Sequence, residues 1–238
     1  MKPFVEEFFR IVKLIETQDS FVFVRYGDGE VSLMQGKSIT ENTQAFVVDK
    51  WKSYGVNKLG QTLLETIKHK DWYFGIPCEC CNLNCKNYLI QSIDVSENQL
   101  TYANLWVNSN YKLFLQWVQN LKIDVVLIGN ENGLNNLQKF PFKVLEYFKV
   151  PNDCVNFYEN NSESLITNLN ELALKYNKTL FFISAGPLSE VIIHHLYNKN
   201  KINKYVDVGS SLDEFIHQKK TRPYMIEGTM YNKKICNF

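Results

Sequence analysis

The chain has 238 residues, of which 45% are hydrophobic, 14% aromatic and 21% charged, and its formal net charge is +1. This length suits one large domain, and the composition is typical of a globular protein rather than a disordered one. The near-neutral charge gives no general attraction to nucleic acid or anionic membranes, so we expect no nucleic-acid partner.

The first predicted element is an amphipathic helix over residues 4–15. Its apolar residues, such as Phe8 and Val12, are interrupted by charged ones such as Glu7 and Arg10. A secretory signal needs an unbroken apolar core, and a membrane-spanning helix needs about 18 or more consecutive apolar residues. We therefore expect a cytoplasmic protein with no transmembrane segment.

Short apolar runs then alternate with longer segments of helical periodicity. Such runs suit strands that are buried on both faces of a parallel sheet, and their spacing is typical of βαβ units. The predicted strands cover residues 21–24, 72–74, 124–128, 155–158, 180–183 and 205–208. The further predicted helices cover residues 59–67, 111–121, 134–148, 165–176 and 190–196.

This alternation predicts an α/β fold that is Rossmann-like, with a mostly parallel sheet and helices on both faces. Because the sequence shows no internal repeat and no linker-like tract, we interpret residues 1–238 as a single domain. Residues 78–111 are less regular, and we interpret them as an insertion or a lid over the site.

Four loops follow predicted strands and carry small or polar residues, at 25–30, 129–132, 184–187 and 209–213. Doubly wound sheets bind ligands in the crevice beyond the carboxyl ends of their strands. The sequence therefore predicts a ligand site where these four loops meet.

The segment Arg25-Tyr-Gly-Asp-Gly-Glu30 directly follows the first predicted strand. In extended backbone, residues two apart point to the same side, about 6.5–7 Å apart, so we expect Asp28 and Glu30 to direct both carboxylates at one space. A divalent cation, with Arg25 nearby, would offset their repulsion. Gly27 and Gly29 leave room for a nucleotide to approach the backbone.

Two other interpretations of this segment stay open. It also fits an ordinary Gly-Asp-Gly turn that is followed by a surface glutamate. The glycines begin a dinucleotide-binding fingerprint as well, but Ser32 stands where the third glycine belongs, which argues against that interpretation.

The Arg-Tyr-Gly-Asp-Gly-Glu element resembles the signature of the GT-D glycosyltransferases, which carry an Asp-X-Glu motif soon after their first strand. The resemblance continues in Phe181-Phe-Ile-Ser-Ala-Gly-Pro187 and in Val206-Asp-Val-Gly-Ser-Ser-Leu-Asp213. It implies a Rossmann-like fold, a nucleoside-diphosphate sugar as donor, and Mn²⁺ or Mg²⁺ bound near Asp28 and Glu30.

Following this resemblance, we expect Asp28 and Glu30 to be catalytic and to hold the donor's diphosphate through the metal ion. Asp213 is the third predicted catalytic residue, either as a general base or, alternatively, as part of a helix cap. The predicted nucleotide-sugar-binding residues are Arg25, Tyr26, Gly27, Gly29, Asn104, Ser184, Ala185, Gly186, Asp207, Ser210 and Ser211. Structural roles stay open for several of them, such as an ion pair for Arg25 or a loop brace for Asn104.

Four of the six cysteines cluster in Cys78-Glu-Cys-Cys-Asn-Leu-Asn-Cys85. Thiolates bind zinc tetrahedrally, but structural sites commonly join two separated cysteine pairs, and this chain has no second Cys-X-X-Cys. Zinc binding, local disulfide pairing and unligated buried thiols are all open for this cluster, and unligated thiols are the plainest interpretation.

The sequence thus predicts a metal-dependent glycosyltransferase of the hexosyltransferase type. We expect it to move a sugar from a UDP-sugar to a glycan or glycoprotein acceptor. The alternatives are a phosphohydrolase, a methyltransferase or a non-catalytic carbohydrate-binding protein. A methyltransferase would need an acid at the end of the second strand, where this chain has Gly75-Ile-Pro77. The donor sugar, the acceptor, the stereochemical outcome and the oligomeric state stay open.

Overall fold

The computed structural model describes residues 2–39 and 51–238. Seven strands form one sheet in the order β3-β2-β1-β7-β6-β4-β5, and every pairing between these strands is parallel. The strands are β1 (Phe21–Arg25), β2 (Tyr73–Ile76), β3 (Leu100–Tyr102), β4 (Val125–Asn130), β5 (Val144–Val150), β6 (Leu180–Ser184) and β7 (Lys204–Asp207). The predicted α/β class is confirmed.

Helices flank this sheet. The α-helices are α1 (Phe4–Thr17), α2 (Asp28–Met34), α3 (Lys58–Thr66), α4 (Glu79–Ser92), α5 (Tyr111–Gln119), α6 (Cys154–Lys175), α7 (Ser189–Lys199) and α8 (Asp213–His217). The 3₁₀ helices are η1 (Glu97–Gln99), η2 (Asn108–Asn110), η3 (Glu131–Lys139), η4 (Gly186–Leu188), η5 (Gly209–Leu212) and η6 (Pro223–Met225).

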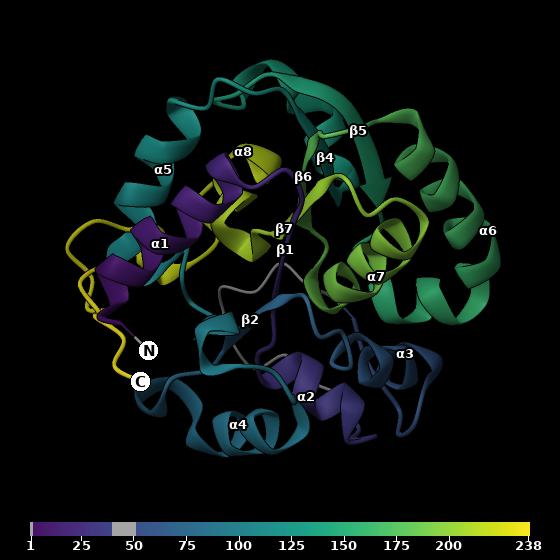
Figure 1. Cartoon of the computed structure of the whole chain (residues 1–238), viewed down its shortest axis with the longest axis horizontal. Coiled ribbons are helices and arrows are strands. Elements are labelled where there is room, and N and C mark those ends of the chain that lie inside the picture. The colour runs from purple at the N-terminus through teal and green to yellow at the C-terminus, as the bar shows by residue number, and fades with distance from the viewer. Residues whose placement is uncertain (1, 40–50) are drawn as a thin grey trace.

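Two hydrophobic cores lie on opposite faces of the sheet. Side chains alternate along a strand, so Phe21 and Phe23 of β1 enter one core while Val22 and Val24 enter the other. The first core packs against α1, α5 and α8, and the second against α2, α3, α4, α6 and α7. Figure 1 shows α1, α5 and α8 together to one side of the strands, with α3, α6 and α7 on the other. The predicted helices on both faces are thus confirmed.

Two of the predicted elements were wrong. Residues 134–148 are not one helix, because η3 ends at Lys139 and the chain continues past Pro141 into β5. Residues 155–158 are not a strand but the start of α6, where the Asp153 side chain accepts a hydrogen bond from the Asn156 amide at 3.3 Å. Such a cap satisfies one of the unpaired amides of a helix start, and it overrides the strand-like apolar run.

Residues 78–111 include an integral part of the sheet. They contain α4, β3 and η2, and β3 pairs with β2 as the edge strand. With only three residues, β3 is too short to show a strand pattern in the sequence. Among the described helices, none has the length and apolar character that crossing a membrane requires.

The start of α1 and the C-terminal end of the chain lie close together (Figure 1). Phe4 of α1 and Cys236 near the C-terminus belong to one small buried cluster, together with Cys78 and Tyr102. The C-terminal segment therefore runs past the start of α4.

Candidate active site

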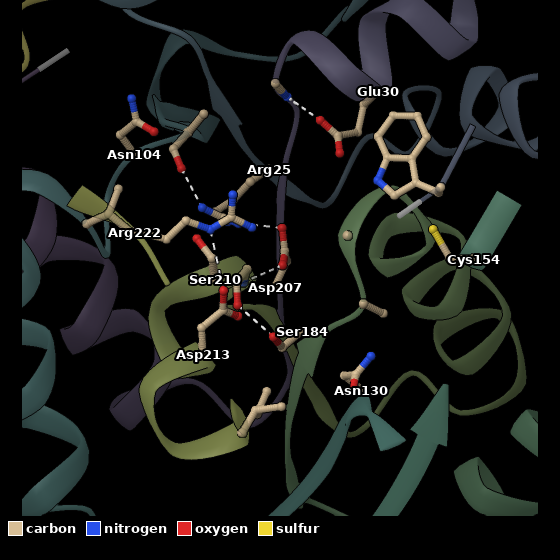
Figure 2. A pocket seen from close by; sticks show the side chains of 18 of the residues that line it. Arg25, Glu30, Asn104, Asn130, Cys154, Ser184, Asp207, Ser210, Asp213 and Arg222 are labelled. Atoms are coloured by element: carbon tan, nitrogen blue, oxygen red, sulfur yellow. Dashed lines mark hydrogen bonds and ion pairs between the residues drawn. The ribbon is translucent and has the colours of Figure 1, made fainter. Parts of the chain in front are cut away.

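A cavity of about 660 Å³ lies at the carboxyl ends of β1, β4, β6 and β7 (Figure 2). This volume falls in the range that small-molecule sites usually occupy, about 300–1,000 Å³. Residues from all four loops that the sequence marked line this cavity, and so do Arg222, Tyr224 and Tyr231 of the C-terminal segment. The rule that ligands bind beyond the carboxyl ends of the strands therefore predicted the position of this cavity.

An ion pair between Arg25 and Asp207 lies in the wall of the cavity. The Arg25 Nε donates to Asp207 Oδ2 at 3.0 Å, and its Nη1 donates to the Ala103 carbonyl at 2.8 Å. The Gly209 amide donates to the other Asp207 oxygen at 2.8 Å. Burial raises the pKa of Asp207, while Arg25 and the Gly209 amide oppose that rise. Burial would lower the pKa of Arg25, but Asp207 and Glu190 together keep it above its usual value.

The Arg25 guanidinium packs directly on the backbone of the loop after β7. Gly209 has a φ of +49°, and a Cβ added there would lie 1.5 Å from Arg25 Nη2. Any other residue at this position would both strain the backbone and displace the arginine. Gly209 is therefore required for the position of Arg25.

A buried glutamate beside this ion pair was not predicted. Glu190, in the first turn of α7, is only 1% exposed, and its Oε2 has no hydrogen-bond partner in the described part of the chain. Burial raises the pKa of Glu190 well above its usual value, and Asp207 and Glu30 raise it further. The surroundings therefore disfavour the charged form of Glu190. In the sequence it looks like an ordinary acid in the first turn of a helix, which favours negative charge.

Asp28 and Glu30 lie in a helix and not in extended backbone, so the strand geometry expected for them was wrong. Gly27 is the N-cap of α2, and the helix begins at Asp28. The Glu30 Oε2 accepts a hydrogen bond from the Gly27 amide at 2.7 Å, which forms one half of a capping box. Asp28 is exposed, and its Oδ1 accepts from the Gly29 amide at 3.1 Å. Both acids still line the cavity.

The surroundings of Glu30 disfavour its charged form. Burial raises its pKa to about 7; the backbone amides of Glu30 and Gly27 lower it, and Asp207 and Asp28 raise it again. Across residues 2–39 and 51–238, no basic side chain forms an ion pair with Asp28 or Glu30. The two carboxylates thus interact with each other electrostatically and form no ion pair with a basic side chain among the described residues.

A divalent cation bound by these acids would take most of its ligands from elsewhere. Within the described residues, Asp28 and Glu30 are not part of any group of three or more potential metal ligands. Mg²⁺ is commonly bound by one or two carboxylates together with water and substrate phosphates. The donor set therefore fits a cation that arrives with a phosphate-bearing substrate.

Asp213 also lines the cavity, at the start of α8. Its Oδ2 accepts a hydrogen bond from Thr221 Oγ1 at 2.7 Å and one from Arg222 Nε at 3.4 Å. Arg222 also lines the cavity and was not predicted, because the irregular C-terminal segment shows no periodic pattern. Asp213 is thus held by the C-terminal segment.

The loop after β6 reaches the cavity as predicted. Ser184, Ala185 and Gly186 all line it, and the Ser184 hydroxyl donates to the Gly209 carbonyl at 2.7 Å. Ser210 lines the cavity as well, and its hydroxyl shares a hydrogen bond of 2.8 Å with Tyr224 Oη. These contacts tie the loops after β6 and β7 to each other and to the C-terminal segment.

The remaining predicted binding residues differ in how they lie relative to the cavity. Ser211 is fully buried away from the cavity, and its hydroxyl donates to the Val208 carbonyl at 2.6 Å. Tyr26 borders the cavity, but its side chain is buried and its hydroxyl bonds to Thr66 at 2.7 Å. Asn104 lines the cavity and donates to Cys81 Sγ at 3.2 Å. Gly29 is not part of the lining.

Three further lining residues carry no sequence signal of their own. They are Trp51, Asn130 and Cys154. The Trp51 ring packs on Gly29 of α2. A Cβ added at Gly29 would lie only 3.2 Å from this ring. Asn130 ends β4, so the rule that ligands bind beyond strand ends pointed to its loop without singling it out. Of the four tryptophans, Trp51 is the one that borders the cavity.

Comparisons with known proteins identify the fold. The sequence matches no protein-family model and no curated protein. Two solved structures of domain of unknown function 1792 share the fold, and the first is described as having a distinct glycosyltransferase fold. It is 15% identical with a TM-score of 0.56, and the second, a selenomethionine-substituted structure, is 16% identical with a TM-score of 0.58. Each match covers 91% of this chain and 81% of the other. The resemblance to GT-D glycosyltransferases is therefore confirmed for the fold.

Proposed function

We propose that this protein is a metal-dependent glycosyltransferase that takes a sugar from a nucleoside-diphosphate sugar, specifically a UDP-sugar. One observation carries the proposal. On a fold shared with a domain described as a glycosyltransferase fold, the acidic pair Asp28 and Glu30 lines the same cavity as Arg25, Asp207 and Asp213. The acceptor is a glycan or glycoprotein.

Asp28 and Glu30 are the residues that hold the cation in this proposal. Neither has a basic partner within the part of the chain that the structure describes, and the cavity beside them has room for a nucleotide. When bound, Mn²⁺ or Mg²⁺ stabilises the negative charge that develops on the departing diphosphate.

The other lining residues bind and orient the substrates. Arg25 is fixed by Asp207 and the Ala103 carbonyl, so it presents a pre-positioned positive charge to the diphosphate. Ser210 and the loop 184–186 provide polar groups for the sugar, and the Trp51 ring provides an apolar surface for stacking. Asp213, held by Thr221 and Arg222, accepts the proton of the acceptor hydroxyl.

The test incubates the protein with a panel of nucleotide sugars, with Mn²⁺ or with EDTA, and measures nucleotide release by mass spectrometry. We expect release from one donor that depends on the metal and falls roughly 100-fold in Asp28→Asn and in Glu30→Gln. Asp19→Asn is the matched control, because Asp19 is an exposed acid that precedes β1 and lies outside the cavity. Equal turnover by all three variants would refute the assigned roles.

The same experiment separates the alternatives. Release of free sugar phosphate without any acceptor would identify a phosphohydrolase. Sugar binding that needs no metal and survives Asp28→Asn would identify a non-catalytic carbohydrate-binding protein.

A further inference from the structure

Four cysteine sulfurs meet at one point beside the cavity. The Sγ atoms of Cys78, Cys80, Cys81 and Cys236 all lie within 4.8 Å of one another. Cys85, the last member of the sequence cluster, is not part of this group, and Cys236 from the C-terminal segment takes its place. The sequence pattern showed no second ligand pair, because the fold supplies the fourth ligand from the far end of the chain.

The fold builds this group from two segments. Cys78 follows β2 and is the N-cap of α4, and Cys80 and Cys81 lie in the first turn of that helix. The C-terminal segment is held alongside, since the Ser109 amide donates to the Lys234 carbonyl at 3.1 Å. The Lys234 ammonium in turn donates to the Cys80 carbonyl at 3.2 Å. These contacts bring Cys236 to the other three cysteines.

The sulfur separations suit one tetrahedral metal ion. Zinc–sulfur bonds of about 2.3 Å place the four sulfurs of a tetrahedral site about 3.8 Å apart. The Cys80 and Cys81 sulfurs are 3.9 Å apart, and the Cys78 and Cys80 sulfurs are 3.1 Å apart. An iron–sulfur cluster would place several iron and sulfide ions between its ligands and needs a wider arrangement of sulfurs.

The surroundings donate hydrogen bonds to sulfur. The Asn104 side-chain amide donates to Cys81 Sγ at 3.2 Å, and the Asn108 side-chain amide donates to Cys236 Sγ at 3.4 Å. With Lys234 nearby, these donors offset the negative charge that four thiolates around a divalent ion would carry. Donors of this kind support metal-binding thiolates in proteins. Cys80 and Cys81 are exposed, so an ion has a path to the group.

We propose that Cys78, Cys80, Cys81 and Cys236 bind one zinc ion in a structural site that joins the C-terminal segment to the start of α4. Four protein ligands leave no open position for chemistry, which is the mark of a structural site. Asn104 and Asn108 line the cavity and also contact ligand sulfurs. The ion therefore also fixes one wall of the cavity.

Metal content and ligand type are measured on the full-length protein, purified under reducing conditions and loaded with zinc. We expect one zinc per chain by elemental analysis, which is released when a mercurial reagent modifies the thiols. Replacement by Co²⁺ should give the intense visible bands of tetrahedral cobalt and a thiolate-to-cobalt charge-transfer band. Neither measurement depends on enzyme activity, so their outcome is independent of the proposed function.

The matched variants are Cys236→Ser and Cys85→Ser. Cys236→Ser removes a ligand and should bind zinc at least 10-fold more weakly. Cys85→Ser changes a cysteine of the same helix that lies outside the group, and it should retain one zinc. The proposal is overturned if the wild-type chain takes up no zinc, if the bound metal is iron, if these cysteines form disulfides in protein kept under reducing conditions, or if both variants bind zinc equally.

Discussion

The carboxyl ends of β1 and β7 each bring two acids to the same cavity, but only the acids at β7 have basic partners among the described residues. Asp207, the last residue of β7, and Asp213, which follows that strand, are buried and each pairs with an arginine, at 3.0 Å with Arg25 and at 3.4 Å with Arg222. After β1, Asp28 and Glu30 have no basic partner in the portion of the chain that the structure describes.

This difference separates acids that arginines hold in the cavity wall, including the proposed base Asp213, from acids that are available to bind a cation. A buried carboxylate with a built-in partner fixes the loops around it. Burial of a carboxylate without a basic partner disfavours its charged form, and the pKa of Glu30 is raised for this reason. Groups with perturbed pKa values in a cavity are characteristic of functional sites. Three stability measurements sharpen this distinction.

The largest expected effect follows from breaking the ion pair between Arg25 and Asp207. Asp207→Asn removes the carboxylate that pairs with Arg25, and the arginine stays buried without this partner. We expect the free energy of unfolding to fall by about 3–5 kcal/mol, measured by urea denaturation. Asp19→Asn, at the exposed surface, should change it little. A loss below about 1 kcal/mol would show that the pair does not hold the fold together.

A smaller effect of opposite sign is expected for Glu30→Gln. The pKa of Glu30 is about 7 in the folded protein and 4.5 in a free side chain, so the folded state binds more protons and its stability falls as pH rises through this range. Glutamine removes this cost, and its side-chain oxygen still accepts from the Gly27 amide. We expect the variant to gain about 1–3 kcal/mol at pH 8 and nothing at pH 4, measured by denaturation at both values. A loss of stability at pH 8 would contradict a strained glutamate.

The smallest effect is expected for Asp28→Asn. Asp28 is exposed, and its one described hydrogen bond reaches the neighbouring Gly29 amide. Its substitution should change the free energy of unfolding by less than about 0.5 kcal/mol, even though turnover falls. Thermal unfolding checks this prediction. A large destabilisation would place Asp28 among the acids that shape the cavity.

Much of the fold could be predicted from the sequence, because buried parallel strands are continuous apolar runs. This pattern located β1, β2, β4, β6 and β7. It failed where local signals competed. The apolar run at 155–158 looked like a strand, but the Asp153 cap starts a helix there. The region 134–148 looked helical, but it is divided between η3 and β5.

The site was predicted where it depends on strand ends and missed where it depends on distant segments. Asp28 and Glu30 follow a strand, Ser184 and Asp207 end strands, and all four line the cavity. Arg222 and Cys236 come from a C-terminal segment without periodicity, and only the tertiary fold brings them to the site. Burial raises the pKa of Glu190, and burial of one acid on a helix leaves no mark in the sequence.

The most direct test of the central claim measures binding rather than turnover. Isothermal titration calorimetry of UDP in the presence and absence of Mn²⁺ asks whether Asp28 and Glu30 bind a diphosphate through a cation. We expect Mn²⁺ to tighten UDP binding at least 10-fold in the wild-type protein and to have no effect in Asp28→Asn or Glu30→Gln, both still folded. UDP binding that is insensitive to Mn²⁺ in the wild-type protein, or equally sensitive in both variants, would contradict the account.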